Sequence, residues 1–112
     1  MTLHENMKNA KIIEEVFAYF LEKGLKEIQS SLLINEKETL FTIVIKTNNI
    51  KLFEQFKQDM VCNRDYELEE YGWELMGDEG SVCELHTLGI LINSYDCKYE
   101  NGVLEIFLHR KK

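Results

Sequence analysis

The chain has 112 residues, with 20 Asp or Glu against 13 Lys or Arg, and a formal net charge of -7 at pH 7. Hydrophobic residues make up 45% and charged residues 29%, an ordinary globular balance that excludes an intrinsically disordered chain. The length suits one domain, so residues 1–112 are expected to fold as a single unit.

The first predicted element is an amphipathic helix. Its apolar residues recur at helical spacing: Ile12, Ile13, Val16, Phe17, Phe20 and Leu21. Lys23 and Gly24 then supply a cation and a residue suited to a left-handed cap, which predicts the end of the helix.

A β-hairpin is predicted next. Residues 26–34 and 39–46 are strand-like runs on either side of the polar residues 35–38. In the second run, Phe41, Ile43 and Ile45 make one face apolar. Leu40 and Val44 add apolar side chains to the opposite face. A strand that is apolar on both faces is typical of the centre of a sheet, so we expect a central position.

The middle of the chain is predicted to be helical. A second, shorter amphipathic helix is indicated by Leu52, Phe53, Phe56 and Met60. Residues 66–76 are compatible with another helix, and residues 85–92 fit a short helix better than a strand. Gly89 lowers helix propensity there by about 1 kcal/mol relative to Ala, so the strand alternative stays open.

A second β-hairpin is predicted at the end of the chain. Residues 94–99 and 103–110 flank Asn101-Gly102, the favoured sequence for a two-residue type I′ turn. The full order is helix, hairpin, two or three helices, hairpin. It predicts an α+β two-layer sandwich, with a mixed, mainly antiparallel sheet of about four strands and three to four helices on one face.

The negative charge is concentrated in residues 59–84, which contain nine acids and one base, Arg64. Such a segment repels phosphate backbones, which argues against a nucleic-acid partner. It is either a solvated face that keeps the protein soluble or a docking surface for a basic protein. In the second case, the predicted surface combines carboxylates with aromatic rings: Glu69, Glu70, Tyr71, Trp73 and Glu74.

Metal, membrane and hydrolase hypotheses find little support in the sequence. Cys62, Cys83 and Cys97 are odd in number and widely spaced, which argues against a zinc site and a disulfide framework. No run of 18 apolar residues occurs and residues 1–11 carry charges and amides with no apolar run, so we expect a cytoplasmic protein that does not bind membranes. The three imidazoles, His4, His86 and His109, have no serine or cysteine placed in sequence as an evident nucleophile.

The order of the predicted elements resembles the ATP-binding fold of histidine kinases and anti-sigma-factor serine kinases, the GHKL ATPases. Residues 88–97 and 101–106 are similar to the closing helix and two strands of that family, and residues 109–112 to its tail. The first helix, the 25–46 hairpin and the 46–51 loop fit the same order. The resemblance therefore covers nearly the whole chain, in pattern and order rather than in motif residues.

This resemblance implies where an ATP site would lie and shows that its motifs are absent. It places the site on Glu14 or Glu15 of the first helix and on Thr47, Asn48 and Asn49 of the following loop. The family's Mg²⁺-holding Asn is replaced by Ala18 or Tyr19, and its Asp-x-Gly-x-Gly loop by residues 47–51, which contain no glycine. Phosphate cradles need unhindered backbone N–H groups and Mg²⁺ needs oxygen ligands, so ATP binding is expected to be lost.

The function predicted from the sequence is a non-catalytic regulatory or protein-interaction domain that needs no cofactor. Its expected partner is a basic protein, and a homodimer is left open. One alternative is a divergent nucleotide-binding domain of a signalling kinase or anti-sigma-factor type, which keeps ATP with magnesium at the residues named above. Another is a small-ligand binding module that uses the same cleft.

Overall fold

The computed structural model describes residues 3–62, 64–67, 69 and 85–112 of the protein. Four strands form one sheet in the order β1-β2-β4-β3, with every neighbouring pair antiparallel. They are β1 (Ile28–Ile34), β2 (Glu38–Lys46), β3 (Ser94–Glu100) and β4 (Val103–Lys111). The predicted α+β fold with a four-stranded sheet is therefore confirmed, and β2 is central as expected.

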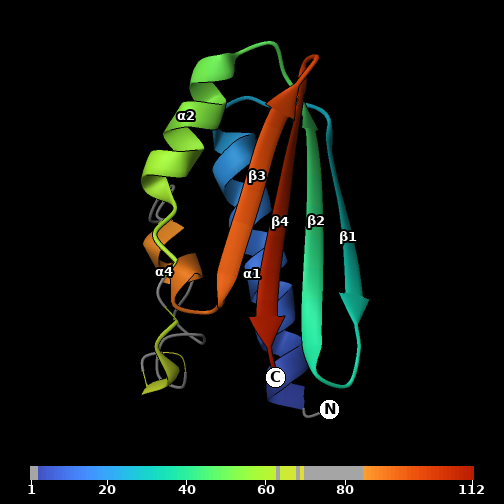
Figure 1. Ribbon diagram of the computed structural model, residues 1–112, viewed down its shortest axis with the longest axis vertical. Coiled ribbons are helices and arrows are strands. Elements are labelled where there is room, and N and C mark those ends of the chain that lie inside the picture. The colour runs from blue at the N-terminus through green and yellow to red at the C-terminus, as the bar shows by residue number, and fades with distance from the viewer. Residues whose placement is uncertain (1–2, 63, 68, 70–84) are drawn as a thin grey trace.

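The helices lie on one side of the sheet (Figure 1). They are α1 (Leu3–Glu22), α2 (Ile50–Asp59) and the five-residue α4 (Leu85–Gly89). The described residues thus contain two full-length helices and one five-residue helix, and residues 66, 67 and 69 are helical as well; the predicted three to four helices are not confirmed. The sheet is wholly antiparallel rather than mixed, because each hairpin supplies adjacent antiparallel strands and β2 pairs antiparallel with β4. The helix predicted at residues 66–76 falls mostly outside the described residues.

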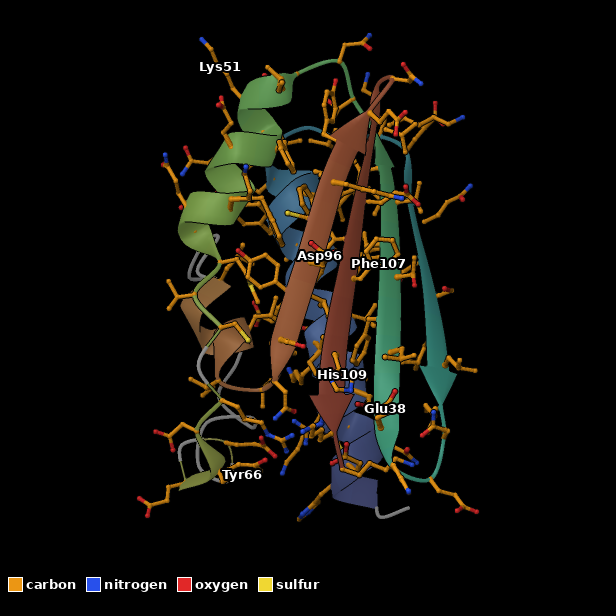
Figure 2. The ribbon with its side chains drawn as sticks, in the orientation of Figure 1. Glu38, Lys51, Tyr66, Asp96, Phe107 and His109 are labelled. Carbon is orange, nitrogen blue, oxygen red and sulfur yellow. The ribbon has the colours of Figure 1, made fainter. Side chains whose placement is uncertain are left out.

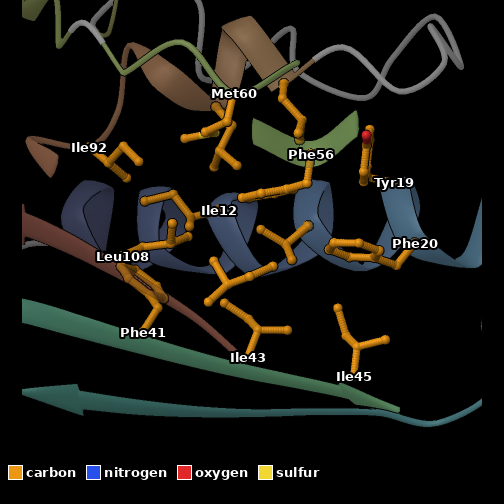
Figure 3. Packing of buried hydrophobic residues seen from close by; sticks show 14 of the residues in the cluster. Ile12, Tyr19, Phe20, Phe41, Ile43, Ile45, Phe56, Met60, Ile92 and Leu108 are labelled. Atoms are coloured by element: carbon orange, nitrogen blue, oxygen red, sulfur yellow. The ribbon is translucent and has the colours of Figure 1, made fainter. Parts of the chain in front are cut away.

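The core lies between the sheet and α1, with α2 and α4 closing its side (Figure 3). β2 and β4 have the same alternating burial, so every second side chain points to the helices. Phe20 of α1 stacks on Phe56 of α2 with ring centroids 5.7 Å apart. The Tyr19 hydroxyl donates to Asp59 at 2.6 Å and ties the same two helices together at their polar rim.

Backbone geometry confirms the predicted turn between β3 and β4. Asn101 has φ 52° and Gly102 has φ 77°, the positive values that a type I′ turn requires at both central residues. The Gly102 carbonyl accepts a hydrogen bond from the Thr47 N–H at 2.9 Å, so this turn also holds the loop that precedes α2.

Residues 85–89 are helical, which answers the question that the sequence left open. Gly89 is required there by packing rather than by backbone freedom. A Cβ added at this position would lie 1.8 Å from the Val61 carbonyl oxygen, far inside van der Waals contact. The glycine that weakens the helical pattern therefore allows the 60–62 segment to cross α4 at close range.

No helix in the described part of the chain has both the length and the apolar character needed to cross a membrane.

Candidate functional site

The face of the sheet opposite the helices is turned toward the viewer in Figure 2. In the described residues no helix covers it. It carries four half-buried apolar side chains on the two central strands: Leu40, Val44, Val103 and Phe107. Thr42 and Glu105 lie between them, and Asp96, Lys98 and Glu100 lie beside them on β3. Apolar side chains beside polar and charged ones are typical of protein-binding surfaces.

A shallow depression of about 240 Å³ lies on this open face. Its lining includes Leu40 and Thr42 of β2, Phe107 and His109 of β4, and Asp96 of β3, so three neighbouring strands contribute to it. Thr42 and Ser94 contribute small side chains to this lining, and Leu40 and Phe107 contribute large ones.

Three polar side chains form a line at one end of the depression. The His109 Nε2 atom lies 3.0 Å from a Glu38 carboxylate oxygen, and the His109 Nδ1 atom lies 3.4 Å from the Ser94 hydroxyl. When Nε2 carries the proton, it donates to Glu38 and Nδ1 accepts from Ser94. The sequence offered no sign of this group, because its members come from three strands and are 71 and 15 positions apart.

The Ser94–His109–Glu38 line resembles a hydrolytic triad only in composition. Acyl transfer depends on preorganised donors that act where water is excluded. Here Ser94 is exposed, and its hydroxyl is at the outer limit of hydrogen-bonding distance from the imidazole. The group supplies polar contacts at the end of an apolar surface, which suits recognition better than catalysis.

The structure brings together only some of the predicted nucleotide residues. Thr47 and Asn49 line a wide pocket of about 510 Å³ between the end of α1 and the start of α2. Glu14 and Glu15 lie on α1 and are not among its lining residues; Glu14 is exposed, with Lys11 at 3.7 Å. Burial raises the pKa of Glu15.

Polar groups of the loop that the resemblance assigns to adenine are hydrogen-bonded to other groups of the chain. The Asn49 side chain caps α2 by accepting from the Lys51 N–H at 3.0 Å. The Thr47 hydroxyl accepts from the Asn49 N–H at 3.1 Å, and its carbonyl accepts from the Tyr99 hydroxyl at 2.8 Å. Asn48 lies against the β3–β4 turn, since a Cβ at Gly102 would be 3.0 Å from its side-chain oxygen. These groups have structural partners within the chain.

A buried ionic cluster lies where β4 ends beside the start of α1. Arg110, which is fully buried, uses its Nε and both terminal nitrogens on Glu5, Glu69 and the Leu91 carbonyl. Lys8 donates to Glu69 at 2.9 Å, and Arg64 Nε donates to the same carboxylate at 3.1 Å. Three cations thus meet two carboxylates, and the guanidinium of Arg110 is satisfied on both edges.

Protonation equilibria in the cluster follow from these contacts. Burial alone would raise the pKa of Glu69, but hydrogen bonds from Arg110 and Lys8 outweigh it and lower the pKa to about 2. The hydrogen bond from Arg110 likewise lowers the pKa of Glu5. Burial disfavours the charged form of Arg110, yet bonds to Glu5 and Glu69 raise its pKa overall. All three groups are charged at neutral pH.

Glu69 is therefore not a surface residue, although the sequence placed it on the predicted interaction surface. It is 3% exposed because the segment that carries it folds back onto Arg110 and Lys8. The other members of that surface, Glu70, Tyr71, Trp73 and Glu74, lie outside the described residues, so their role stays a prediction.

The cysteines in the described part of the chain carry no metal-site geometry. Cys62 and Cys97 are free thiols, and burial raises the pKa of both. Among the described residues, no group of three or more His, Cys, Asp or Glu side chains is placed to hold a metal ion.

Comparison of the chain with protein-family models, with curated proteins and with solved structures finds no match to any of them.

Proposed function

We propose that this chain is a non-catalytic regulatory or protein-interaction domain, and that the open face of its sheet is a recognition surface. The observation that carries the proposal is the helix-free face, on which half-buried Phe107 and Leu40 line a depression next to the Ser94–His109–Glu38 line. Half-buried apolar side chains surrounded by polar groups favour binding to another protein.

The expected partner is a basic protein. The net charge of -7 attracts positively charged surfaces and speeds their encounter. The acidic residues 59–84, with nine acids and one base, supply this negative charge, and Glu70 and Glu74 are the members of the predicted surface that are open to a charge-reversal test. Glu69 is excluded from such a test because its reversal would place a cation among Arg110, Lys8 and Arg64.

The open face is tested by Phe107→Asp, with Ile50→Asp as the matched control. Both residues carry apolar side chains that contact solvent, and Ile50 is 55% exposed at the start of α2, away from the open face. Proteins cross-linked to the chain in cells and identified by mass spectrometry should include basic partners that are lost in Phe107→Asp and kept in Ile50→Asp. If both variants fold and recover the same partners as the unaltered chain, the open face is not the recognition surface.

The kinase-like ATPase fold without its ATP motifs remains part of this proposal. It is supported by the element order and by the internal partners of Thr47, Asn48 and Asn49. A ligand at 100 times its dissociation constant stabilises a fold by about 2.7 kcal/mol. We therefore expect no thermal shift with millimolar ATP or ADP, with or without Mg²⁺, and a clear Mg²⁺-dependent rise would overturn this proposal.

The alternative is a small-ligand binding module that uses the 510 Å³ pocket. The observation in its favour is the lining, which holds Lys23 and Lys51 and no acid in a chain that is acidic overall. Lys23 already lies over the Tyr19 ring, 4.6 Å from its centroid, so it has an aromatic partner. A thermal shift produced by inorganic phosphate and removed by Lys51→Ala would show that this pocket accepts an anionic ligand; equal melting temperatures with and without phosphate would reject an anion as its ligand.

A further inference from the structure

The two edges of the sheet differ in their protection against pairing with another strand. β3 carries Asp96, Lys98 and Glu100, and Tyr99 of this strand stacks on Phe53 of α2 with ring centroids 6.0 Å apart. β1 has the sequence IQSSLLI, with no charge over its seven residues, and the chain contains no proline. Edge strands are normally blocked by charges, prolines, bulges or covering elements. β1 has neither charge nor proline along its length.

β1 also exposes apolar side chains on both of its faces. Leu32 and Ile34 are 39% and 41% exposed on the face toward the helices, and Leu33 is 61% exposed on the open face. On α1, the side opposite the Tyr19–Asp59 contact carries Ile13, Phe17 and Leu21 at helical spacing, and Leu21 is 58% exposed. α1, which contacts β1, therefore exposes an apolar side chain as well.

The backbone groups of β1 that point away from β2 can be assigned from the bonds between the two strands. The Glu27 carbonyl accepts from the Lys46 N–H, and the Asn35 N–H donates to the Glu38 carbonyl. Residues of an antiparallel strand alternate between bonding to one side and to the other. Odd-numbered residues from 27 to 35 thus bond to β2, and Ile28, Ser30, Leu32 and Ile34 direct their N–H and C=O groups outward.

This alternation makes β1 complementary to itself. In an antiparallel pair centred on Ser31, Ile28 of one copy lies across from Ile34 of the other, and Ser30 lies across from Leu32. All four residues have outward backbone groups, so the register satisfies both strands along their full length. The face toward the helices meets the same face in the second copy, and apolar Ile28 and Ile34 become cross-strand neighbours.

Charges at the two ends of β1 agree with the same register. Lys26 precedes the strand and Glu36 follows it, and both are exposed. A centre at Ser31 places Lys26 of each copy across from Glu36 of the other, which gives two opposite-charge pairs. A second copy is therefore matched in backbone groups, in apolar side chains and in charge.

We infer that β1 pairs with β1 of a second copy of this chain, antiparallel about a two-fold axis at Ser31. The product is a continuous eight-stranded sheet with the helices of both copies on one side and both open faces on the other. The interface is isologous, as in most homodimers. It leaves Phe107 and the depression uncovered, so the inference does not depend on the proposed recognition surface.

The test compares Ser31→Lys with Gln58→Lys by sedimentation velocity over a range of protein concentrations. The unaltered chain should sediment as a dimer. Ser31 is exposed and its backbone groups bond to β2, so Ser31→Lys should preserve the monomer fold while placing two lysines against each other at the axis. We expect Ser31→Lys to sediment as a monomer and Gln58→Lys, which adds the same charge on exposed α2, to remain a dimer.

Register is tested separately by cysteine cross-linking and charge exchange. Ser31→Cys should form an intermolecular disulfide under mild oxidation, because directly opposed residues that do not bond to each other lie about 4.5 Å apart at Cα. Gln58→Cys, with the same native thiols, should not. Lys26→Glu should weaken the dimer several-fold, and Lys26→Glu combined with Glu36→Lys should restore it.

A monomeric unaltered chain at all concentrations would overturn the inference, as would a dimer that Ser31→Lys leaves intact. Either result leaves the Phe107→Asp experiment unaffected, so failure of the dimer and failure of the recognition surface can be told apart.

Discussion

The same strands form both faces of the sheet, and different groups of polar side chains lie at the end of each face. On β4, Ile106 points into the core and is fully buried, while its neighbour Phe107 points to the open face and is half-buried. The covered face ends in the ionic cluster around Arg110, and the open face ends in the Ser94–His109–Glu38 line. The charged groups of the ionic cluster are bonded within the chain and stabilise it, whereas the Ser94–His109–Glu38 line lies at the surface, where a partner can reach it.

The largest expected effect is on the covered face, at Arg110. Arg110→Met should lower the free energy of unfolding by about 3–5 kcal/mol, because it leaves buried Glu69 with fewer cations. The neighbouring Lys111→Met removes an exposed side chain and should change the free energy by less than about 0.5 kcal/mol. Urea denaturation of both variants measures the difference. Similar losses in the two would mean that the cluster does not stabilise the fold.

Ile106 and Phe107 give the most direct comparison of the two faces. Ile106→Ala should cost about 2–5 kcal/mol through lost burial and the cavity it leaves in the core. Phe107→Ala should cost about 1 kcal/mol or less, because its ring is already in contact with solvent. Chemical denaturation of the two variants side by side tests this, and a larger loss for Phe107→Ala would reverse the assignment of the faces.

Gly89 tests the layer that closes the covered face. In an exposed helix, Gly→Ala would stabilise by about 1 kcal/mol. At Gly89 the new methyl group would meet the Val61 carbonyl, so we expect Gly89→Ala to destabilise by about 1–3 kcal/mol instead. The sign of the change in melting temperature is the readout: a rise would show that the 60–62 segment does not lie against α4.

The smallest expected effect is the change that Glu69 causes in the free energy of unfolding when the pH is varied near neutrality. Its pKa is about 2 in the folded protein, below the ordinary value of 4.5, so the folded state favours the charged carboxylate. Its contribution to stability is complete above pH 4.5 and is lost as the pH falls toward 2. Unfolding free energies should therefore hardly change through Glu69 between pH 7 and 5, and should fall below pH 4.5.

The matched variant for this pH dependence is Glu69→Gln, which keeps the shape of the side chain without the titrating group. It should be less stable than the unaltered chain at neutral pH and should lose less stability between pH 4.5 and 2. Parallel pH profiles for the two proteins would contradict the assignment of a low pKa to Glu69.

Local features of the sequence predicted most of the elements. The period-two alternation of β2 and β4 reflects a backbone whose successive side chains point to opposite faces, and Asn101-Gly102 specifies the positive φ angles of its turn. The spacing of Ile12, Val16 and Phe20 predicted α1, because residues four positions apart lie on one face of a helix. In each case the information lies within a few neighbouring residues, so the chain itself determined the α+β fold class and the central position of β2.

Only the tertiary structure decided which distant residues meet. Arg110 and Glu5 are 105 positions apart and come together because β4 ends beside the start of α1. The same folding buried Glu69, which its acidic surroundings had indicated as a surface residue, and turned Gly89 from a weak point of a helix into a required contact. The Ser94–His109–Glu38 line depends on the strand order β1-β2-β4-β3. Strand order and layer packing bring together residues that share no local pattern, so no reading of neighbouring positions could have assembled these groups.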